Sequence, residues 1–124
     1  MPTRIIITVG DVELSAELND SSTAAQVITQ LPFGAHAHRW GGEFYFTIPV
    51  DHAAETDARD EMAVGELAYW PPGNAFCIFF GPTPVSCVSE PWAANPCNPL
   101  GQILDDIAPL LEARDGVNVQ VQLA

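Results

Sequence analysis

The sequence contains no lysine. Its 124 residues hold four arginines against sixteen aspartates and glutamates, which gives a formal net charge of -12. A surface of this sign repels the phosphates of nucleic acids and of anionic lipids. We therefore expect neither a nucleic-acid partner nor a membrane partner.

Long hydrophobic runs are absent as well. No stretch approaches the roughly 20 apolar residues that a membrane-spanning helix needs. The N-terminal stretch MPTRIIITVGDVE reaches a charge again at Asp11 and lacks the small-residue cleavage site of a signal peptide. These features predict a cytoplasmic protein. An apolar fraction of 48% at this length predicts one domain, residues 1–124, with a single packed core.

Cysteine is scarce, and the usual catalytic motifs are missing. Cys77, Cys87 and Cys97 are an odd number, are widely spaced and form no Cys-x-x-Cys pair. This pattern argues against a disulfide framework and excludes a zinc ribbon. Neither a Gly-x-Ser-x-Gly nucleophile elbow nor a glycine-rich phosphate loop occurs. We expect no cofactor and assign no catalytic residue.

Strand-forming sequence dominates both ends of the chain. Residues 3–9 predict one strand and residues 11–18 a second, in which apolar and polar residues alternate as in a half-buried strand. The final stretch VNVQVQL alternates in the same way. Its side chains expected to point inward are Val117, Val119, Val121 and Leu123.

The stretch GELAYWPPGNAFCIFFGPTP, residues 65–84, combines turns with an apolar run. Its Pro-Pro-Gly sequence forces a turn, because proline fixes φ and removes a backbone donor. Residues 75–80, AFCIFF, then form a continuous apolar run of strand length. We predict a strand that is covered on both faces, with a role in the core.

Helical periodicity is limited. Residues 23–31 carry apolar side chains at helical spacing, Thr23 and Gln26 have the spacing of a capping box, and Pro32 ends the helix. Residues 51–66, with six acids and one arginine, predict a solvated loop, and residues 85–98 a loop without regular structure.

Residues 35–50, AHAHRWGGEFYFTIPV, predict a hairpin with Gly41-Gly42 at its turn. Because strand side chains alternate, one face should carry three opposed pairs. These pairs are Trp40 with Glu43, His38 with Tyr45, and His36 with Thr47. Arg39 falls on the other, apolar face, near the rim of the core.

Strands outnumber helices and no β-α-β rhythm repeats, which favours a mainly antiparallel β-barrel. The motifs WGGEFYFTIP, GELAYWPPGNAFCIFFGPTP and NPLG resemble a small prokaryotic cyclophilin-like family over nearly the whole chain. The resemblance implies a closed eight-stranded antiparallel barrel with two short helices. It also implies a strand at NPLGQIL and a short helix at DIAPLLE, where periodicity alone predicts one helix over about residues 99–112.

The resemblance also bears on function. In prolyl isomerases of the cyclophilin type, a Phe-His-Arg-Ile strand supplies the arginine that polarises the prolyl amide. Here the matching pair is His38-Arg39, but Trp-Gly-Gly follows it, and AFCIFF keeps the paired phenylalanines without the Ser-Gln that precedes them in the isomerases. Members of this branch look like proteins of unassigned function. We expect a peptide- or small-molecule-binding module, with weak prolyl isomerisation or a non-catalytic assembly role as alternatives.

The hairpin is the expected binding surface, because the resemblance places it where cyclophilins carry their groove. Amphipathic aromatic rings provide contact area at low entropic cost, and a carboxylate orients a polar group. The candidate ligand-binding residues are His38, Arg39, Trp40, Glu43, Tyr45, Tyr69 and Trp70. The same aromatic face would also suit a homodimer contact.

A metal site is the competing interpretation of this hairpin. His36-x-His38 followed by Glu43 is similar to the first ligand motif of cupins. The cupin pattern needs a further histidine where this chain has Phe76, and only His52 remains elsewhere. We expect no physiological metal, and a weak Zn²⁺ or Ni²⁺ site at the two hairpin histidines stays an open alternative.

Overall fold

A computed structural model describes residues 2–87 and 90–124 of the protein. Its strands are β1 (Thr3–Val9), β2 (Val12–Leu18), β3 (Phe33–His36), β4 (His38–Trp40), β5 (Glu43–Thr47), β6 (Arg59–Glu61), β7 (Glu66–Trp70), β8 (Ala75–Phe79), β9 (Trp92–Ile103) and β10 (Asn118–Leu123). Its helices are α1 (Ser22–Thr29) and two 3-10 helices, η1 (Pro71–Gly73) and η2 (Ala108–Glu112). Within the described ranges, no helix is long and apolar enough to cross a membrane.

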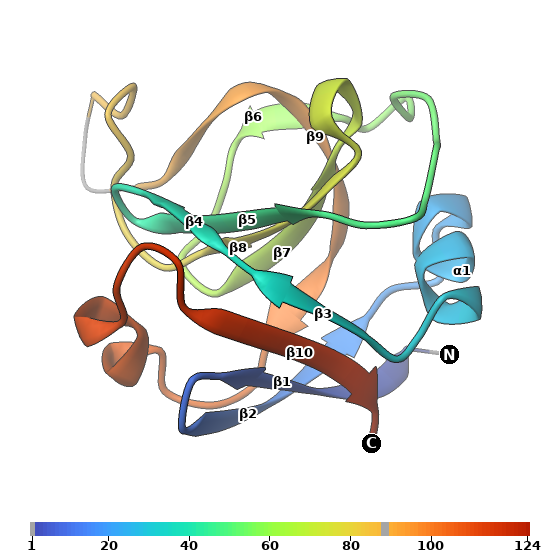
Figure 1. Cartoon of the computed structure of the whole chain (residues 1–124). Coiled ribbons are helices and arrows are strands. Elements are labelled where there is room, and N and C mark those ends of the chain that lie inside the picture. Colours follow the sequence, from blue (N-terminus) through green and yellow to red (C-terminus); the bar gives the residue numbers. More distant parts are fainter. Residues whose placement is uncertain (1, 88–89) are drawn as a thin grey trace.

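The ten strands form one strongly curved antiparallel sheet (Figure 1). Hydrogen-bonded neighbours follow the order β3-β10-β1-β2-β9-β7-β8-β5-β4, and β6 pairs with β9 beside this path. Across the residues that the structure covers, no pairing joins the end strands β3 and β4. The expected closed, eight-stranded barrel is therefore corrected to an open sheet of ten strands.

Ala37 explains why the expected strand before the Gly41-Gly42 turn is divided. Its backbone N–H donates to the carbonyl of Val117 (2.8 Å), and its carbonyl accepts from the N–H of Gly116 (2.8 Å). The chain before Ala37 therefore pairs as β3 with β10, and the chain after it pairs as β4 with β5. One predicted strand becomes two, and the sheet stays open between them.

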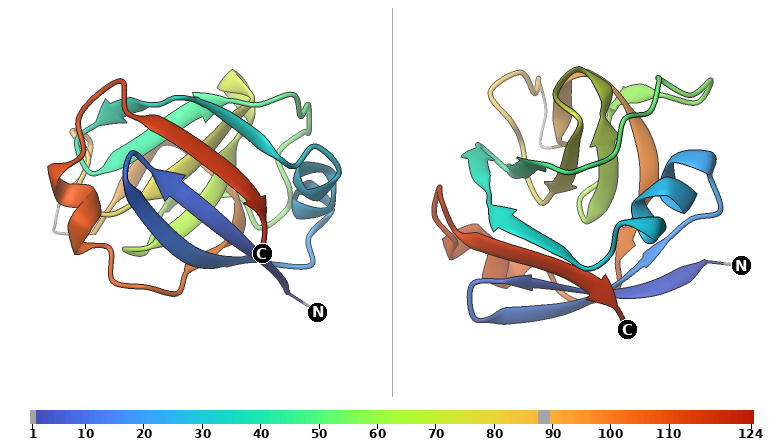
Figure 2. Two further views of the ribbon diagram at one scale, coloured as in Figure 1. Left: turned by 60° about the horizontal axis from the view of Figure 1, so that its bottom comes forward. Right: turned by 45° about the vertical axis from the view of Figure 1, so that its right-hand side comes forward.

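The expected helices are present. α1 and the short helix η2 lie at opposite ends of the curved sheet (Figure 2). The predicted capping box is wrong, because the side chain of Ser21 accepts the N–H of Ala24 (3.1 Å) and caps α1. Thr23 instead donates to a carboxylate oxygen of Glu55 (2.6 Å).

Buried Asn98 attaches the acidic segment after β5 to the sheet. Its side-chain amide donates to Thr23 Oγ1 and to the carbonyl of Ala53, both at 3.0 Å, and its oxygen accepts from the N–H of Glu55 (2.8 Å). This satisfied buried network holds the segment close to α1 and β9. The expected solvated loop therefore has internal contacts, and its end forms β6.

β9 is twelve residues long and bends, so that its two halves serve different parts of the sheet (Figure 1). The first half pairs with β6, and the second half pairs with β7 and β2. The prediction of a loop over residues 85–98 is wrong for this first half, because a long-range partner compensates for a proline-interrupted sequence. The predicted strand over residues 98–104 is confirmed, because the second half of β9 runs through this stretch to Ile103.

The main core fills the inside of the curved sheet. The side chains of Val119 and Val121 are fully buried there, and those of Asn118 and Gln120 face solvent, as the alternation predicts. Leu123 departs from the prediction, because it is 54% exposed at the end of β10.

β8 is buried on both faces, as its sequence predicts. Phe76 and Ile78 belong to the main core, whereas Cys77 and Phe79 point to the opposite, outer face of the sheet. A second hydrophobic cluster covers that face, and we call it the outer cluster. Its buried members are Met62, Ala68, Ala75, Cys77, Phe79, Ala93 and Cys97, with Tyr45 and Trp70 packed against them.

The hairpin has the predicted register around Gly41-Gly42. Trp40 lies opposite Glu43, and His38 lies opposite Tyr45. The third predicted pair is wrong, because His36 pairs with Asn118 of β10. The hairpin therefore presents five of the six expected side chains on its outer face, namely Trp40, Glu43, His38, Tyr45 and Thr47.

Candidate functional site

A cavity of about 150 Å³ opens on the outer face of the sheet. It lies between the β4–β5 hairpin, the end of β7 and the first half of β9. The lining residues are Trp40, Glu43, Tyr45, Trp70, Ala93, Ala94 and Cys97. We call this cavity the aromatic pocket, because three of the seven residues carry aromatic rings.

The aromatic rings are held by their neighbours. Tyr45 lies between two rings, that of His38 at 5.2 Å and that of Trp70 at 6.2 Å, with the Trp70 contact edge-to-face. The indole N–H of Trp70 donates to Asn95 Oδ1 (3.2 Å). A Cβ on Gly73 would lie 2.5 Å from the Trp70 ring, so the ring can pack against this turn only because residue 73 is glycine.

Glu43 provides the only ionisable carboxyl of the aromatic pocket. The residue is 5% exposed and pairs with Phe79 of β8, so it lies over the outer cluster. Burial raises the pKa of Glu43 to about 7, and a hydrogen bond with the Cys77 thiol offsets part of this rise. Burial also raises the pKa of Cys77, and the neighbouring Cys97 and Glu43 raise it further. All three cysteines are free, so the buried thiols of Cys77 and Cys97 form no disulfide.

Ionisation of Glu43 is expected to weaken the fold. Its pKa is about 7 in the folded protein against 4.5 for an ordinary glutamate, so between these values the folded state binds more protons than the unfolded state. The free energy of unfolding therefore falls as the pH rises through this window. Between pH 5 and pH 8 the loss from this group should be about 2–3 kcal/mol. Urea unfolding of wild type and Glu43→Gln at both pH values measures it, because the amide does not titrate.

Glu17→Gln is the matched control, since it removes the same charge from a side chain that is 26% exposed. This variant should lose stability with pH as the wild type does. A Glu43→Gln profile that runs parallel to the wild-type profile would show that Glu43 ionises normally in the folded protein.

Arg39 does not line the aromatic pocket. Its guanidinium donates to the carbonyls of Leu111 (2.9 Å) and Ala113 (2.6 Å), and its Nε donates to Gly41 (2.9 Å). The group also lies 4.9 Å from the centre of the Phe80 ring. Arg39 thus joins the hairpin to the η2 region from the inner face, at the rim of the core, as the alternation predicts.

The other candidates lie around or below the aromatic pocket. Trp40, Glu43, Tyr45 and Trp70 line it, and His38 stacks on Tyr45 at its edge. Tyr69 is fully buried in the main core, where its hydroxyl donates to the carbonyl of Val50 (2.7 Å). The structure therefore does not bring Tyr69 together with Trp70, because adjacent strand residues point to opposite faces.

Sequence reasoning missed the wall that β9 contributes. Ala93, Ala94 and Cys97 belong to the half of β9 that was expected to be a loop. No local pattern marks them, since their position depends on the pairing of β9 with β6. The only local signal is the small side chain of each alanine, which leaves room for the cavity.

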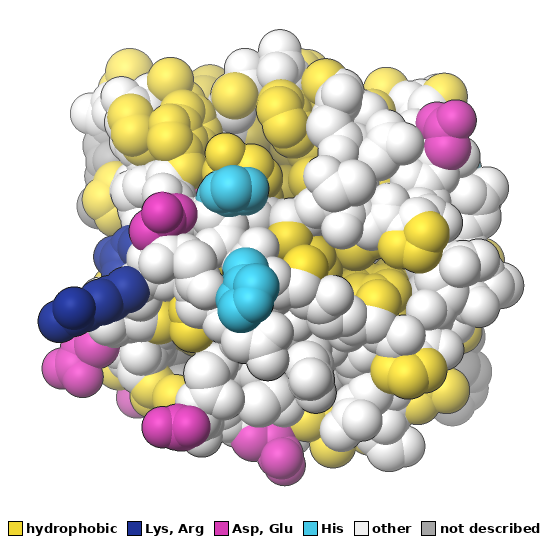
Figure 3. Space-filling view, viewed as in Figure 1, with side chains coloured by type: hydrophobic (Ala, Val, Ile, Leu, Met, Phe, Trp, Pro, Cys, Tyr) yellow, Lys and Arg dark blue, Asp and Glu magenta, His cyan; other side chains and the backbone are white. Residues whose placement is uncertain are grey.

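The hairpin histidines do not converge with Glu43. His36 is exposed and its Nδ1 lies 3.0 Å from the carbonyl of Gly116, whereas Glu43 is buried. Histidines lie at the surface near β4 in Figure 3, with hydrophobic side chains gathered above them. Among residues 2–87 and 90–124, no group of three His, Cys, Asp or Glu side chains could hold a metal ion.

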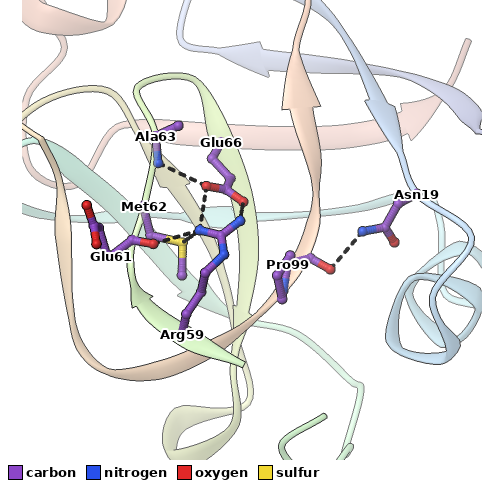
Figure 4. Close-up of polar contacts among 7 residues, drawn as sticks. All are labelled: Asn19, Arg59, Glu61, Met62, Ala63, Glu66 and Pro99. Carbon is purple, nitrogen blue, oxygen red and sulfur yellow. Dashed lines mark hydrogen bonds and ion pairs between the residues drawn. The ribbon is translucent and has the colours of Figure 1, made fainter. Parts of the chain in front are cut away.

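A second, larger cavity of about 440 Å³ lies beside β2, β7 and β9. Arg59 and Glu66 form a bidentate ion pair at its edge (Figure 4). The same Glu66 carboxylate accepts the N–H of Ala63 (2.9 Å), and Asn19 donates to the carbonyl of Pro99 (2.9 Å). Its charged side chains are paired with charged side chains, Arg59 with Glu66 and Glu17 with Arg4, whereas the Glu43 carboxyl of the aromatic pocket is bonded to the Cys77 thiol.

Comparisons with known proteins agree with this architecture. The family description "Cyclophilin-like" matches residues 3–122. A hypothetical protein of Archaeoglobus fulgidus, known from a solution structure, is 34% identical with a TM-score of 0.83, over 99% of this chain and 95% of that chain. McbB in complex with tryptophan is 13% identical with a TM-score of 0.69, over 96% of this chain and 44% of that chain, a likeness that shows the fold alone. None of the curated proteins is significantly similar to the chain. With a match from β1 to β10, this chain belongs to the cyclophilin-like family.

Proposed function

We propose that the protein is a binding module whose aromatic pocket takes a compact small molecule or a single side chain of a peptide. The observation that carries this proposal is the combination of Trp40, Tyr45 and Trp70 around one buried carboxyl. Binding sites are typically concave and apolar, with a few placed polar groups that orient the ligand. The aromatic pocket has both features.

The size of the cavity limits the ligand. A volume of about 150 Å³ is below the roughly 300–1,000 Å³ of sites for drug-sized molecules. A cavity of about 150 Å³ accepts a ligand of the size of benzene. The occupant is therefore a small molecule or one side-chain-sized group of a larger ligand.

Prolyl isomerisation is not part of this proposal. Polarising a prolyl amide needs a donor beside the bound peptide, and Arg39 is the counterpart expected from the cyclophilin motif. Its guanidinium is engaged with the carbonyls of Gly41, Leu111 and Ala113. No observation in the described part of the chain favours the assembly alternative over binding.

A binding panel tests the proposal. The probes are benzyl alcohol, choline, tryptophan and an N-acetylated Ala-Pro dipeptide, each titrated calorimetrically. Tryptophan is included because McbB, which shares the fold, is known in complex with it. We expect at least one probe to bind, and Trp70→Leu to weaken it about tenfold or more through the loss of one aromatic wall.

Trp92→Leu is the matched control. Trp92 is half-buried like Trp70 and lies on β9, but it does not line the aromatic pocket. This variant should bind the same probe with wild-type affinity. A panel in which nothing binds, or binding that survives Trp70→Leu unchanged, would contradict the proposed function.

A further inference from the structure

The aromatic pocket contains a buried carboxyl without a cationic partner. Glu43 is 5% exposed, and no ion pair joins it to an arginine or histidine of residues 2–87 and 90–124. Arg39, the nearest arginine along the chain, uses its guanidinium on backbone carbonyls at the other face. The partner that Glu43 has is the Cys77 thiol, which carries no charge when protonated.

Three aromatic side chains border the same small cavity. They come from different strands, with Trp40 on β4, Tyr45 on β5 and Trp70 on β7. The faces of indole and phenol rings attract cations through their quadrupoles, and tryptophan does so best. A cation in this cavity would therefore meet aromatic rings and one carboxylate together.

We infer that the ligand of the aromatic pocket carries a compact methylated ammonium group, for which Glu43 is the counter-charge and Trp40, Tyr45 and Trp70 are the surrounding rings. This inference rests on the proposed function and names its ligand class.

The lining of the cavity selects a methylated ammonium over a primary one. A primary ammonium has three N–H donors, and each would need an acceptor in the cavity. The acceptors among the lining side chains are the Glu43 carboxyl and the Tyr45 hydroxyl, and the rest of the lining is aromatic rings, the methyl groups of Ala93 and Ala94, and the Cys97 thiol. Methyl groups on the nitrogen need no acceptor and pack against this surface, as in aromatic cages for quaternary ammonium ligands.

Binding of such a cation should be linked to the ionisation of Glu43. The pKa of Glu43 is about 7 in the free protein, so at pH 5.5 only a few per cent of the molecules carry the carboxylate, and at pH 8.5 nearly all do. A cationic ligand that pairs with the carboxylate should therefore bind on the order of 30-fold more tightly at pH 8.5 than at pH 5.5. The other titratable groups that line the cavity are the Tyr45 phenol and the Cys97 thiol. The Cys77 thiol bonds to Glu43, and the His38 ring stacks on Tyr45 at the cavity edge, so Glu43→Gln is needed to assign the pH dependence to the carboxyl.

The experiment compares choline with its carbon isostere 3,3-dimethylbutan-1-ol, in which carbon replaces the charged nitrogen. Calorimetric titrations of the full chain at pH 5.5, 7.0 and 8.5 measure both affinities. We expect choline to bind at least tenfold more tightly than the alcohol at pH 8.5, and only choline to show the rise with pH. Glu43→Gln should remove both differences, whereas Glu17→Gln, which changes the net charge equally, should remove neither.

Alcohol binding that equals or exceeds choline binding, or choline binding that is flat with pH, would overturn the inference. In either case the aromatic pocket still binds a ligand, and the proposed function stands. If neither probe binds, the inference is overturned as well, and the remaining probes of the panel then decide the proposed function. The wild-type pH profile needs no variant, so a Glu43→Gln protein that failed to fold would not rescue the inference.

Discussion

Val119→Asp is expected to abolish cooperative folding. Val119 is fully buried in β10, which pairs there with Val9 of β1 and with Ala35 of β3. A carboxylate at this position would have no cationic partner, and an uncompensated buried charge costs several kcal/mol, about 3–5 kcal/mol in comparable cases. That is a large part of the roughly 5–15 kcal/mol by which a domain is stable. Circular dichroism and a proton–nitrogen correlation spectrum would detect the loss of structure.

Gln120→Asp is the control for this variant. The neighbouring residue is exposed on the opposite face of the same strand, so the same new charge would remain in water. This protein should melt within a few degrees of the wild type. If Val119→Asp also melted like the wild type, the assignment of inner and outer faces in β10 would be incorrect.

Phe79→Ala should lower the free energy of unfolding by about 3–5 kcal/mol, because it deletes a large side chain from a packed cluster. Phe79 is fully buried in the outer cluster and lies opposite Glu43 in the β5–β8 pairing. The variant therefore also removes support from beneath the aromatic pocket. Urea unfolding at constant pH gives the stability change.

Leu123→Ala provides the comparison, since Leu123 is 54% exposed at the end of β10. Its stability change should stay within about 0.5 kcal/mol. A change of similar size for Phe79→Ala would mean that the outer cluster contributes little to the fold.

Local patterns predict much of this fold. The alternation over residues 117–121, the apolar run of β8 and the paired glycines of the hairpin each depend on side chains close in sequence, and the structure confirms them. The family resemblance correctly divides the stretch that periodicity alone predicts as one helix over about residues 99–112. In the structure its first part completes β9, and η2 follows after a break.

Contacts between distant segments explain what local patterns miss. The first half of β9 contains Pro96, and a strand there depends on its pairing with β6. The split at Ala37 depends on backbone hydrogen bonds to Val117 and Gly116 of a distant segment. Neither interaction leaves a periodic signal near the residues concerned.

Local patterns likewise predict part of the candidate site. Trp40, Glu43 and Tyr45 follow from the register of one hairpin, and the structure places all three in the aromatic pocket. Strand alternation also accounts for Tyr69, since it lies next to Trp70 and must point to the other face. The burial of Glu43 could not be predicted, because β9, which covers that face, comes from fifty residues later in the chain.

We propose that this protein binds its ligand in the aromatic pocket. A titration with the tightest-binding probe of the panel, followed by proton–nitrogen correlation spectra, tests it most directly, because each backbone amide reports its own surroundings. We expect the largest shifts on residues 40–45, Trp70 and residues 93–97, which border the cavity. Shifts confined to the second cavity around Arg59 and Glu66, or spectra that change with no probe of the panel, would contradict this assignment.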